Sequence, residues 1–311
     1  MVTQSNYLNL QIEESIKKAL KNNEPVVAME STLFVHGLPK ESSINLLYEL
    51  NEIAKKEKVN LAIIAILKGV LKIGLSEEEI VELIEKGSLN SVDKAGIRDI
   101  SFNIALERDA ATTVSSTLWA ANKVGLKVLS TGGIGGVHVG FPKTVDISAD
   151  LYALSQHSLI VVCSGPKAFL DIKNTFELLE SLSIPIVGYR SSYFPAFFCG
   201  EDKDLKLKYV FNNPKEIANV YMKMRNLGIK HSLLVTNPVL KEHEIDKNLA
   251  KKAIGKALRL AKERDIKGSK VTPFILKHIA ELTGSKSLKT NLILIKENFK
   301  LACQIAKELY L

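Results

Sequence analysis

The chain has 311 residues, of which 46% are hydrophobic and 24% are charged, and its 42 Lys and Arg against 34 Asp and Glu give a formal net charge of +8. This composition excludes a disordered or collagen-like chain, because the apolar content suffices for a sizeable core. The apolar runs, such as 61–67, are far too short to span a bilayer, so no membrane segment is expected.

The N-terminus and the cysteines indicate the compartment. Residues 1–25 lack a basic stretch followed by an apolar one, so no signal peptide is expected. The three cysteines lie far apart, in neither a metal-ligand nor a disulfide spacing: Cys163, Cys199 and Cys303. A reducing cytoplasm is therefore predicted. The positive charge alone is compatible with nucleic-acid binding, but lysines interleave with glutamates over 55–58 and 251–267, which favours solvated helix faces.

Apolar runs alternate with amphipathic patterns along the chain. Strands are predicted over 25–29, 61–67, 127–131, 159–164, 184–189 and 232–237. Helices are predicted over 41–57, 76–87, 111–125 and 168–183, with a capping box at Ser76 and Glu79 and stops at Gly87 and Gly125. The strand runs are continuously apolar, as expected for strands that are covered on both faces. This alternation predicts a three-layer α/β/α fold with a central, largely parallel sheet.

Two segments refine this fold. The segment 67–75 has the pattern of a local hairpin, so the sheet is expected to be mixed. After Pro238 the pattern is mainly helical, over 244–265, 272–283 and 292–308. Since no Ser-, Gly- or Pro-rich linker precedes this part, we expect one domain over 1–311 with a helix-rich C-terminal part from about 240.

Ligands of open α/β sheets bind at the carboxyl ends of the strands. Glu30 directly follows the predicted strand 25–29, where apolar neighbours would raise its pKa and suit it to donate a proton. A helix-capping or ion-paired glutamate is the alternative at this position.

A glycine-rich string, STGGIGGVHVG (130–140), follows the strand 127–131. Its five glycines would let backbone N–H groups close around an anion such as phosphate. His138 stands where a dinucleotide fingerprint has its third glycine, and the chain has no Walker A pattern. A turn that binds no ligand is the alternative.

Asp146 and Asp150 lie four residues apart, so they would share a face if this segment begins a helix. Two carboxylates and a serine near a phosphate loop suit a hard divalent cation. A helix cap made by Asp146 or Ser148 explains the same residues equally well.

Two lysines follow predicted strands or turns. Lys167 is expected just inside a helix opened by Pro166, where the positive helix N-terminus would lower its pKa and leave a nucleophilic amine. Lys94 lies in a polar turn and would suit phosphate recognition. For both residues the alternative is a lysine that extends to solvent.

Taken together, these strings resemble the pseudouridine-5′-phosphate glycosidases, also called indigoidine-synthase-A-like proteins. The resemblance covers nearly the whole chain in family order, over 29–39, 66–79, 93–99, 111–121, 130–140, 146–151, 165–171, 185–198, 236–239, 268–284 and 287–298. It implies reversible conversion of pseudouridine 5′-phosphate and water to uracil and ribose 5-phosphate. It also implies a divalent metal, typically Mn²⁺, a mixed-sheet α/β/α fold and a homotrimer.

The resemblance also implies roles for individual residues. Glu30 matches the family's proton donor, Lys167 its nucleophile and Asp146 its metal position. The substrate-binding positions it implies are Lys94, Val114, Ser148, Ala149, Asp150 and the uracil-facing Asn291. The partner is thus a small phosphorylated substrate, with no nucleic acid and no membrane.

The chemistry suits these residues. The bond to be cleaved joins two carbons, so the paired-carboxylate route of ordinary glycosidases does not apply. An imine between Lys167 and C1′ of the opened sugar would accept the electrons, and Glu30 would protonate the base. The chain departs from the family at Val139, where many members carry Arg, and at Pro166, where they carry a small residue.

Three other functions are less compatible with the sequence or stay open beside this one. A non-catalytic nucleotide- or phosphosugar-binding protein would be expected to lack Glu30, Lys94, Asp150 or Lys167, and all four are present. An RNA-binding module is disfavoured by the 6% aromatic content and the absence of an aromatic-plus-basic cluster. An enzyme that acts on a different C-nucleotide stays open, because base recognition depends on few residues.

Overall fold

A mixed sheet forms the centre of this computed structural model, which describes residues 9–268 and 271–310. Within these residues its main path runs β1 (Leu10–Ile12), β4 (Val70–Ile73), β3 (Asn60–Leu67), β2 (Val26–Glu30), β7 (Val128–Ser130), β8 (Ile160–Cys163), β13 (Leu233–Thr236), β9 (Ile186–Tyr189), β12 (Val210–Phe211). Two short strands, β5 (Asp93–Ala95) and β6 (Ala110–Thr112), extend it from β3, and β10 (Tyr193–Pro195) pairs separately with β11 (Glu201–Lys206).

The pairing confirms a mixed, largely parallel sheet. β3 runs antiparallel to β4 and β6, and the other described pairs of this sheet are parallel. β3 and β4 form the predicted hairpin, in which Leu67 pairs with Val70. The two turn residues, Lys68 and Gly69, have φ angles of 47° and 74°, as a tight two-residue hairpin requires.

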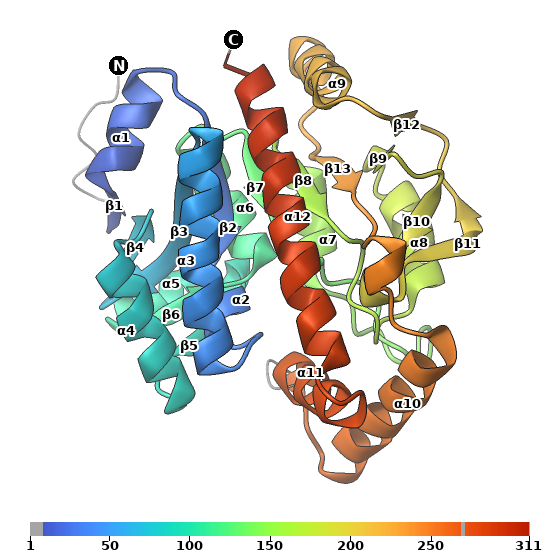
Figure 1. The fold of residues 1–311 in the computed structure, drawn as a ribbon. Helices are drawn as coiled ribbons and strands as arrows, with labels where there is room; N and C mark the ends of the chain where they lie inside the picture. Colours follow the sequence, from blue (N-terminus) through green and yellow to red (C-terminus); the bar gives the residue numbers. More distant parts are fainter. Residues whose placement is uncertain (1–8, 269–270, 311) are drawn as a thin grey trace.

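Helices cover both faces of the sheet (Figure 1). Val27 and Met29 of β2 pack on one face, whereas Val26 and Ala28 pack on the other, so this strand is buried on both sides. The first face is covered by α2 (Thr32–Val35), α3 (Lys40–Glu57), α4 (Glu77–Ser88), α9 (Pro214–Asn226) and α12 (Lys286–Glu308). The second is covered by α1 (Glu14–Lys21), α5 (Ile100–Ala105), α6 (Val114–Lys123), α7 (Ala149–Gln156) and α8 (Ile172–Ser181). The predicted three-layer α/β/α fold is thereby confirmed.

The C-terminal part is helical, as predicted from about residue 240. Figure 1 shows α10 (Lys247–Glu263) and α11 (Val271–Leu282) at one end of the molecule, with the long α12 crossing the sheet between α3 and α9. α12 contacts β2, β7 and β8, so it packs over the strands whose ends carry the predicted site. Three short 3₁₀ helices complete the described elements: η1 (Ile97–Asp99), η2 (Phe197–Cys199) and η3 (Lys241–His243).

Two predicted helices begin later than expected. The first two residues of the predicted helix 111–125 belong to β6 instead, because they pair with β3 and β5. The predicted helix 168–183 begins only at Ile172, where the Asp171 side chain accepts from Asn174 N. Pro166 instead forms a bridge with Ile134, so the expectation of a helix opened by Pro166 was wrong.

In the described part of the chain, no helix is both long enough and apolar enough to cross a membrane. Two parts of the predictions lie outside the described residues. They are residues 1–8, within the N-terminal segment for which no signal peptide is expected, and residues 269–270, within the string 268–284.

Candidate active site

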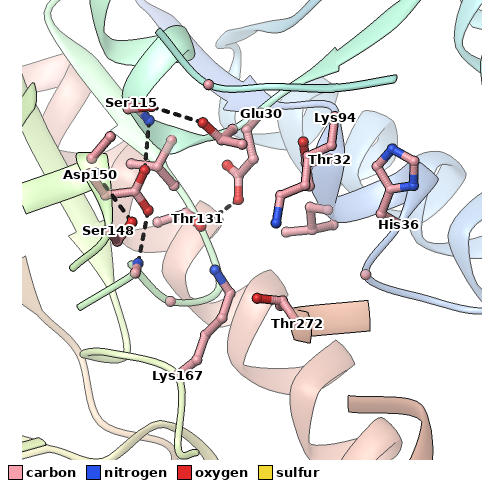
Figure 2. Close-up of a pocket in the computed structure, with 18 of the residues that line it drawn as sticks. Glu30, Thr32, His36, Lys94, Ser115, Thr131, Ser148, Asp150, Lys167 and Thr272 are labelled. Carbon is pink, nitrogen blue, oxygen red and sulfur yellow. Dashed lines mark hydrogen bonds between the residues drawn. The ribbon is translucent and has the colours of Figure 1, made fainter. Parts of the chain in front are cut away.

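A cavity of about 320 Å³ lies where several strands of the sheet end. Glu30 is the last residue of β2, Lys94 lies in β5, Thr131 follows β7, and Lys167 follows β8. Figure 2 shows these side chains directed toward a shared space. The structure places every predicted site residue on this cavity: Glu30, Lys94, Val114, Asp146, Ser148, Ala149, Asp150, Lys167 and Asn291.

Glu30 is a deeply buried carboxyl group of the cavity, with 5% of its surface exposed, the same fraction as Asp150. Its Oε1 accepts a hydrogen bond from Thr131 Oγ1 at 2.5 Å, whereas Oε2 is buried and has no hydrogen-bond partner among the described residues. Burial raises the pKa of Glu30 to about 7, against the weaker lowering effects of the Thr131 hydrogen bond and the Lys167 charge. Within the described part of the chain, Glu30 neither caps a helix nor forms an ion pair, and it can hold a proton near neutral pH.

Lys94 and Lys167 bring two amines to the same cavity (Figure 2). Burial, and to a lesser degree the Lys167 charge, lower the pKa of Lys94 to about 8, against the attraction of Asp150. The cavity therefore offers two amines that could pair with an anion such as a phosphate.

Lys167 lies in the loop between β8 and α8, and not in a helix as the sequence predicted. Its backbone N–H donates to Ile134 O at 3.1 Å, so this loop is tied to the glycine-rich loop. The helix-terminus argument for a nucleophilic Lys167 was therefore wrong, because α8 begins five residues later. The position of Lys167 on the cavity, beside Glu30, is what remains in favour of a chemical role.

The glycine-rich loop encloses an anion that the chain itself supplies. Asp150 Oδ2 accepts from Gly135 N at 2.8 Å, and its Oδ1 accepts from Ser115 N at 2.9 Å. Other N–H groups of the loop, those of Ile134 and Val137, bond to protein oxygens as well. The expected phosphate cradle is thus in large part occupied by a carboxylate and other protein acceptors.

Asp150 lies at the N-termini of two helices, α6 and α7. Ser148 caps α7, since its Oγ accepts from Asp150 N at 3.2 Å, and Ala149 is the first residue of that helix. Val114 is the first residue of α6 and is buried. The cap made by Ser148, one of the two alternatives for this segment, is confirmed.

Asp146 lies before α7, so it does not share a helix face with Asp150 as the spacing predicted. Its side chain is 67% exposed, and its Oδ2 lies 3.8 Å from Nδ1 of His138. Burial lowers the pKa of His138 although Asp146 acts in the opposite direction, which leaves a neutral imidazole beside a carboxylate. In the described part of the chain, no group of three His, Cys, Asp or Glu side chains is arranged to hold a metal.

Further polar residues line the cavity that sequence reasoning did not single out: Thr32, His36, Thr131, Thr272 (Figure 2). His36 Nε2 is buried without a hydrogen-bond partner among the described residues, and burial lowers the pKa of this histidine. Two of these residues could have been found from the sequence. His36 lies in the string 29–39 with Glu30, and Thr131 lies in the glycine-rich string 130–140.

A second cavity of about 590 Å³ adjoins the first. The two share His36 and Gly37 after α2, Pro273 and Leu276 of α11, and Asn291 of α12. Asn291 Oδ1 is buried in this shared wall with no hydrogen-bond partner in the described parts. The shared wall therefore carries two polar atoms, His36 Nε2 and Asn291 Oδ1, that have no hydrogen-bond partner among the described residues and could bond to a ligand.

Comparisons with known proteins agree with one another. The family described as indigoidine synthase A like protein matches residues 15–308. The chain is 41% identical over 298 residues to the pseudouridine-5′-phosphate glycosidase of Thermosipho africanus, covering 96% of this chain and 99% of that protein. It is 42% identical over 300 residues to the protein of the same name from Caldanaerobacter subterraneus, covering 96% of each.

Solved structures extend this likeness to the fold. An indigoidine synthase A-like protein from Thermotoga maritima superimposes with a TM-score of 0.90 at 37% identity, over 100% of both chains. The prealnumycin C-glycosynthase AlnA, solved in complex with ribulose 5-phosphate, superimposes with a TM-score of 0.87 at 28% identity, over 98% of both chains. By its sequence and its fold alike, this chain belongs to the indigoidine synthase A-like family.

Proposed function

We propose that this chain is a pseudouridine-5′-phosphate glycosidase, which reversibly converts pseudouridine 5′-phosphate and water to uracil and ribose 5-phosphate in nucleotide catabolism. Relatives that carry this name match it over nearly their whole length. The observation that carries the proposal is the convergence of Glu30, a carboxyl group with a pKa of about 7, and Lys167 on one cavity. A proton donor and an amine are what cleavage of a carbon–carbon glycosidic bond needs.

In the proposed reaction, Nζ of Lys167, as the free amine, attacks C1′ while the bond from C1′ to the ring oxygen breaks and that oxygen takes a proton. Glu30 then donates its proton to the base carbon as the carbon–carbon bond breaks, and the nitrogen lone pair forms an imine with C1′. Water hydrolyses the imine, releases ribose 5-phosphate and restores Lys167. Glu30 suits this role because it is protonated in part of the population near neutral pH.

The remaining cavity residues would bind the substrate. Lys94 offers a positive charge to the phosphorylated sugar, and the segment Ser148 to Asp150 lines the cavity beside Val114. Asn291, with its unused Oδ1, would face the base, because an amide can pair with the polar edge of a pyrimidine. Val139, where many family members carry Arg, is 60% exposed and offers no charge, which leaves more of the phosphate recognition to Lys94.

A divalent cation, typically Mn²⁺, is proposed at Asp146. One exposed carboxylate beside a neutral His138 fits a cation that keeps most of its water ligands and is completed by substrate phosphate. When bound, such an ion would offset the phosphate charge, and Asp146 would hold it at the rim of the cavity.

A homotrimer in the cytoplasm is proposed on the family resemblance and on the free cysteines, which suit a reducing compartment. The mass of the purified protein, measured by light scattering, tests the trimer directly.

One alternative is favoured by a specific observation. AlnA is named a C-glycosynthase and was solved with ribulose 5-phosphate, so this fold also serves a protein named for joining a different C-glycoside. If this chain acts on another base, the lysine chemistry would persist while uracil release would not.

The experiment is an ultraviolet assay of uracil release from pseudouridine 5′-phosphate, with Mn²⁺ and then with a chelator. We expect release that depends on metal and disappears in Lys167→Ala and Glu30→Gln. No release by the folded wild-type protein would contradict the proposed substrate, and an active Lys167→Ala variant would contradict the proposed nucleophile.

A further inference from the structure

We infer that Thr131 is a positioning residue that anchors one oxygen of Glu30 and so makes the other, Oε2, the atom that carries the acid proton. The inference deepens the proposed function, since it concerns the proton donor of that reaction. It rests on the geometry of the sheet and on two buried hydrogen-bonding networks.

The register of two strands brings the residues together. β2 and β7 are parallel, with Val27 opposite Val128 and Ala28 opposite Leu129. Continuing that register by two residues places Glu30 beside Thr131, at the carboxyl end of both strands. The Thr131 hydroxyl donates to Glu30 Oε1 across 2.5 Å, and the two residues are 1% and 5% exposed.

The backbone of Thr131 is fixed on both sides. Its N–H donates to Val162 O of β8 at 3.0 Å, and its carbonyl accepts from Nδ2 of Asn298 on α12 at 2.9 Å. Asn298 is fully buried, and its Oδ1 in turn accepts from Nδ2 of Asn237 at 3.1 Å. The hydroxyl that meets Glu30 is therefore presented from a position that three strand ends and one helix define.

This arrangement makes the two oxygens of Glu30 inequivalent. While the Thr131 hydroxyl donates to Oε1, that oxygen is the carbonyl-type acceptor of the neutral carboxyl group, so the proton belongs on the other oxygen. Oε2 is buried and has no hydrogen-bond partner among the described residues, and the Glu30 side chain lines the cavity. The neutral carboxyl group therefore carries its proton on Oε2, the oxygen that no described residue engages.

Thr131 also limits how far burial raises the pKa of Glu30, because its hydrogen bond favours the charged form. The charged groups that act on Glu30 are Lys167, in the loop after β8, and Asp150, on α7. A substitution at position 131 changes neither of these charges, so any change in titration reports the lost hydroxyl.

The test compares Thr131→Val, which has nearly the same shape and no hydroxyl, with Thr131→Ser, which keeps the hydroxyl. Titration of the Glu30 carboxyl is followed by infrared difference spectroscopy, with Glu30→Gln used to assign the band. We expect the transition to rise by about one pH unit in Thr131→Val and to stay in place in Thr131→Ser. The pH profile of kcat/KM should move in the same direction, with kcat lowered at every pH.

An unchanged titration in Thr131→Val, or an equal shift in Thr131→Ser, overturns the inference. Circular dichroism and thermal unfolding show whether Thr131→Val folds, and if it does not, Thr131→Cys replaces it, since a thiol is a weak donor. The infrared titration needs no substrate. A shift in a protein that releases no uracil therefore contradicts the proposed function alone, whereas normal uracil release without a shift contradicts this inference alone.

Discussion

The backbone N–H of Gly135 donates to Oδ2 of Asp150 across 2.8 Å, and this contact leaves no room for a side chain at position 135. A β-carbon there would lie 2.1 Å from Ser148 Oγ and 2.9 Å from Asp150 Oδ2. The glycine loop and the start of α6 are therefore joined through the Asp150 carboxylate, and the cap of α7 is joined to them through the backbone N–H of the same residue.

We expect Gly135→Ala to push Ser148 and Asp150 away from the loop and to lower kcat/KM at least ~100-fold, since displacements of about 1 Å cost this much at active sites. Gly255→Ala is the matched control, because a β-carbon at Gly255 in α10 meets no atom within 4 Å. The control should keep full activity and gain roughly 0.5–1 kcal/mol of stability. Uracil release and thermal unfolding measure both; equal activities of the two variants would contradict the packing argument.

Borohydride should trap Lys167. Incubation with ribose 5-phosphate and borohydride is expected to reduce an imine at this residue and leave a covalent adduct that peptide mass spectrometry locates. Glu30→Gln should still be trapped, because imine formation with the free sugar needs no proton transfer to a base. An adduct on Lys94 in its place would show that the other amine of the cavity is the nucleophile.

Stability should depend on the protonation of Glu30. Its pKa is raised by burial from 4.5 to about 7, so the folded protein keeps a proton that the unfolded chain releases between these pH values. The free energy of unfolding therefore falls as pH rises through this window, by up to roughly 3 kcal/mol from this group. Glu30→Gln removes this contribution. Urea unfolding should therefore show that, between pH 5 and pH 8, the free energy of unfolding of the variant rises relative to that of the wild type. If the difference in free energy of unfolding between the two proteins stayed constant across that range, it would contradict a raised pKa of Glu30.

Two asparagines of α12 should separate stability from binding. Asn298→Ala leaves the carbonyl of Thr131 and the amide of Asn237 without their partner, at a cost of ~3 kcal/mol. Asn291→Ala loses no hydrogen bond of Oδ1, so its stability should change by less than about 1 kcal/mol while KM rises ~10-fold. Urea unfolding and steady-state kinetics distinguish the two; a KM effect confined to Asn298→Ala would contradict the placement of the base.

Metal dependence should disappear with Asp146. In the wild type a chelator is expected to suppress uracil release and Mn²⁺ to restore it. Asp146→Ala should show the low, chelated rate under both conditions, because Asp146 is the carboxylate proposed to hold the ion. Retained activation by Mn²⁺ in Asp146→Ala would place the ion elsewhere.

The long strands could be predicted because strands buried on both faces are continuously apolar, as β3 and β8 are. Short strands such as β1, β5 and β12 have two or three residues, and only their pairing defines them. The start of α8 was misjudged because Pro166 is common in a first helical turn. Here it pairs with Ile134 of the glycine loop instead, a contact between distant segments that no local pattern reveals.

The site was predictable to the extent that its residues end strands. Glu30 follows from its place at the end of β2, and its high pKa follows from burial. The bond from Thr131 depends on the register between β2 and β7, which the sequence does not state. Likewise, Asp150 was predicted beside a cation, whereas the fold surrounds it with backbone N–H groups.

The place of Asn298 has a consequence for the order in which the protein matures. α12 is synthesised after every strand that it joins, and its Asn298 fastens the segments that follow β7 and β13. Domains fold as units during synthesis, and a sheet that emerges from the ribosome before α12 lacks this clamp. The segments that follow β7 and β13 can therefore be fixed to each other only after residue 298 has left the ribosome.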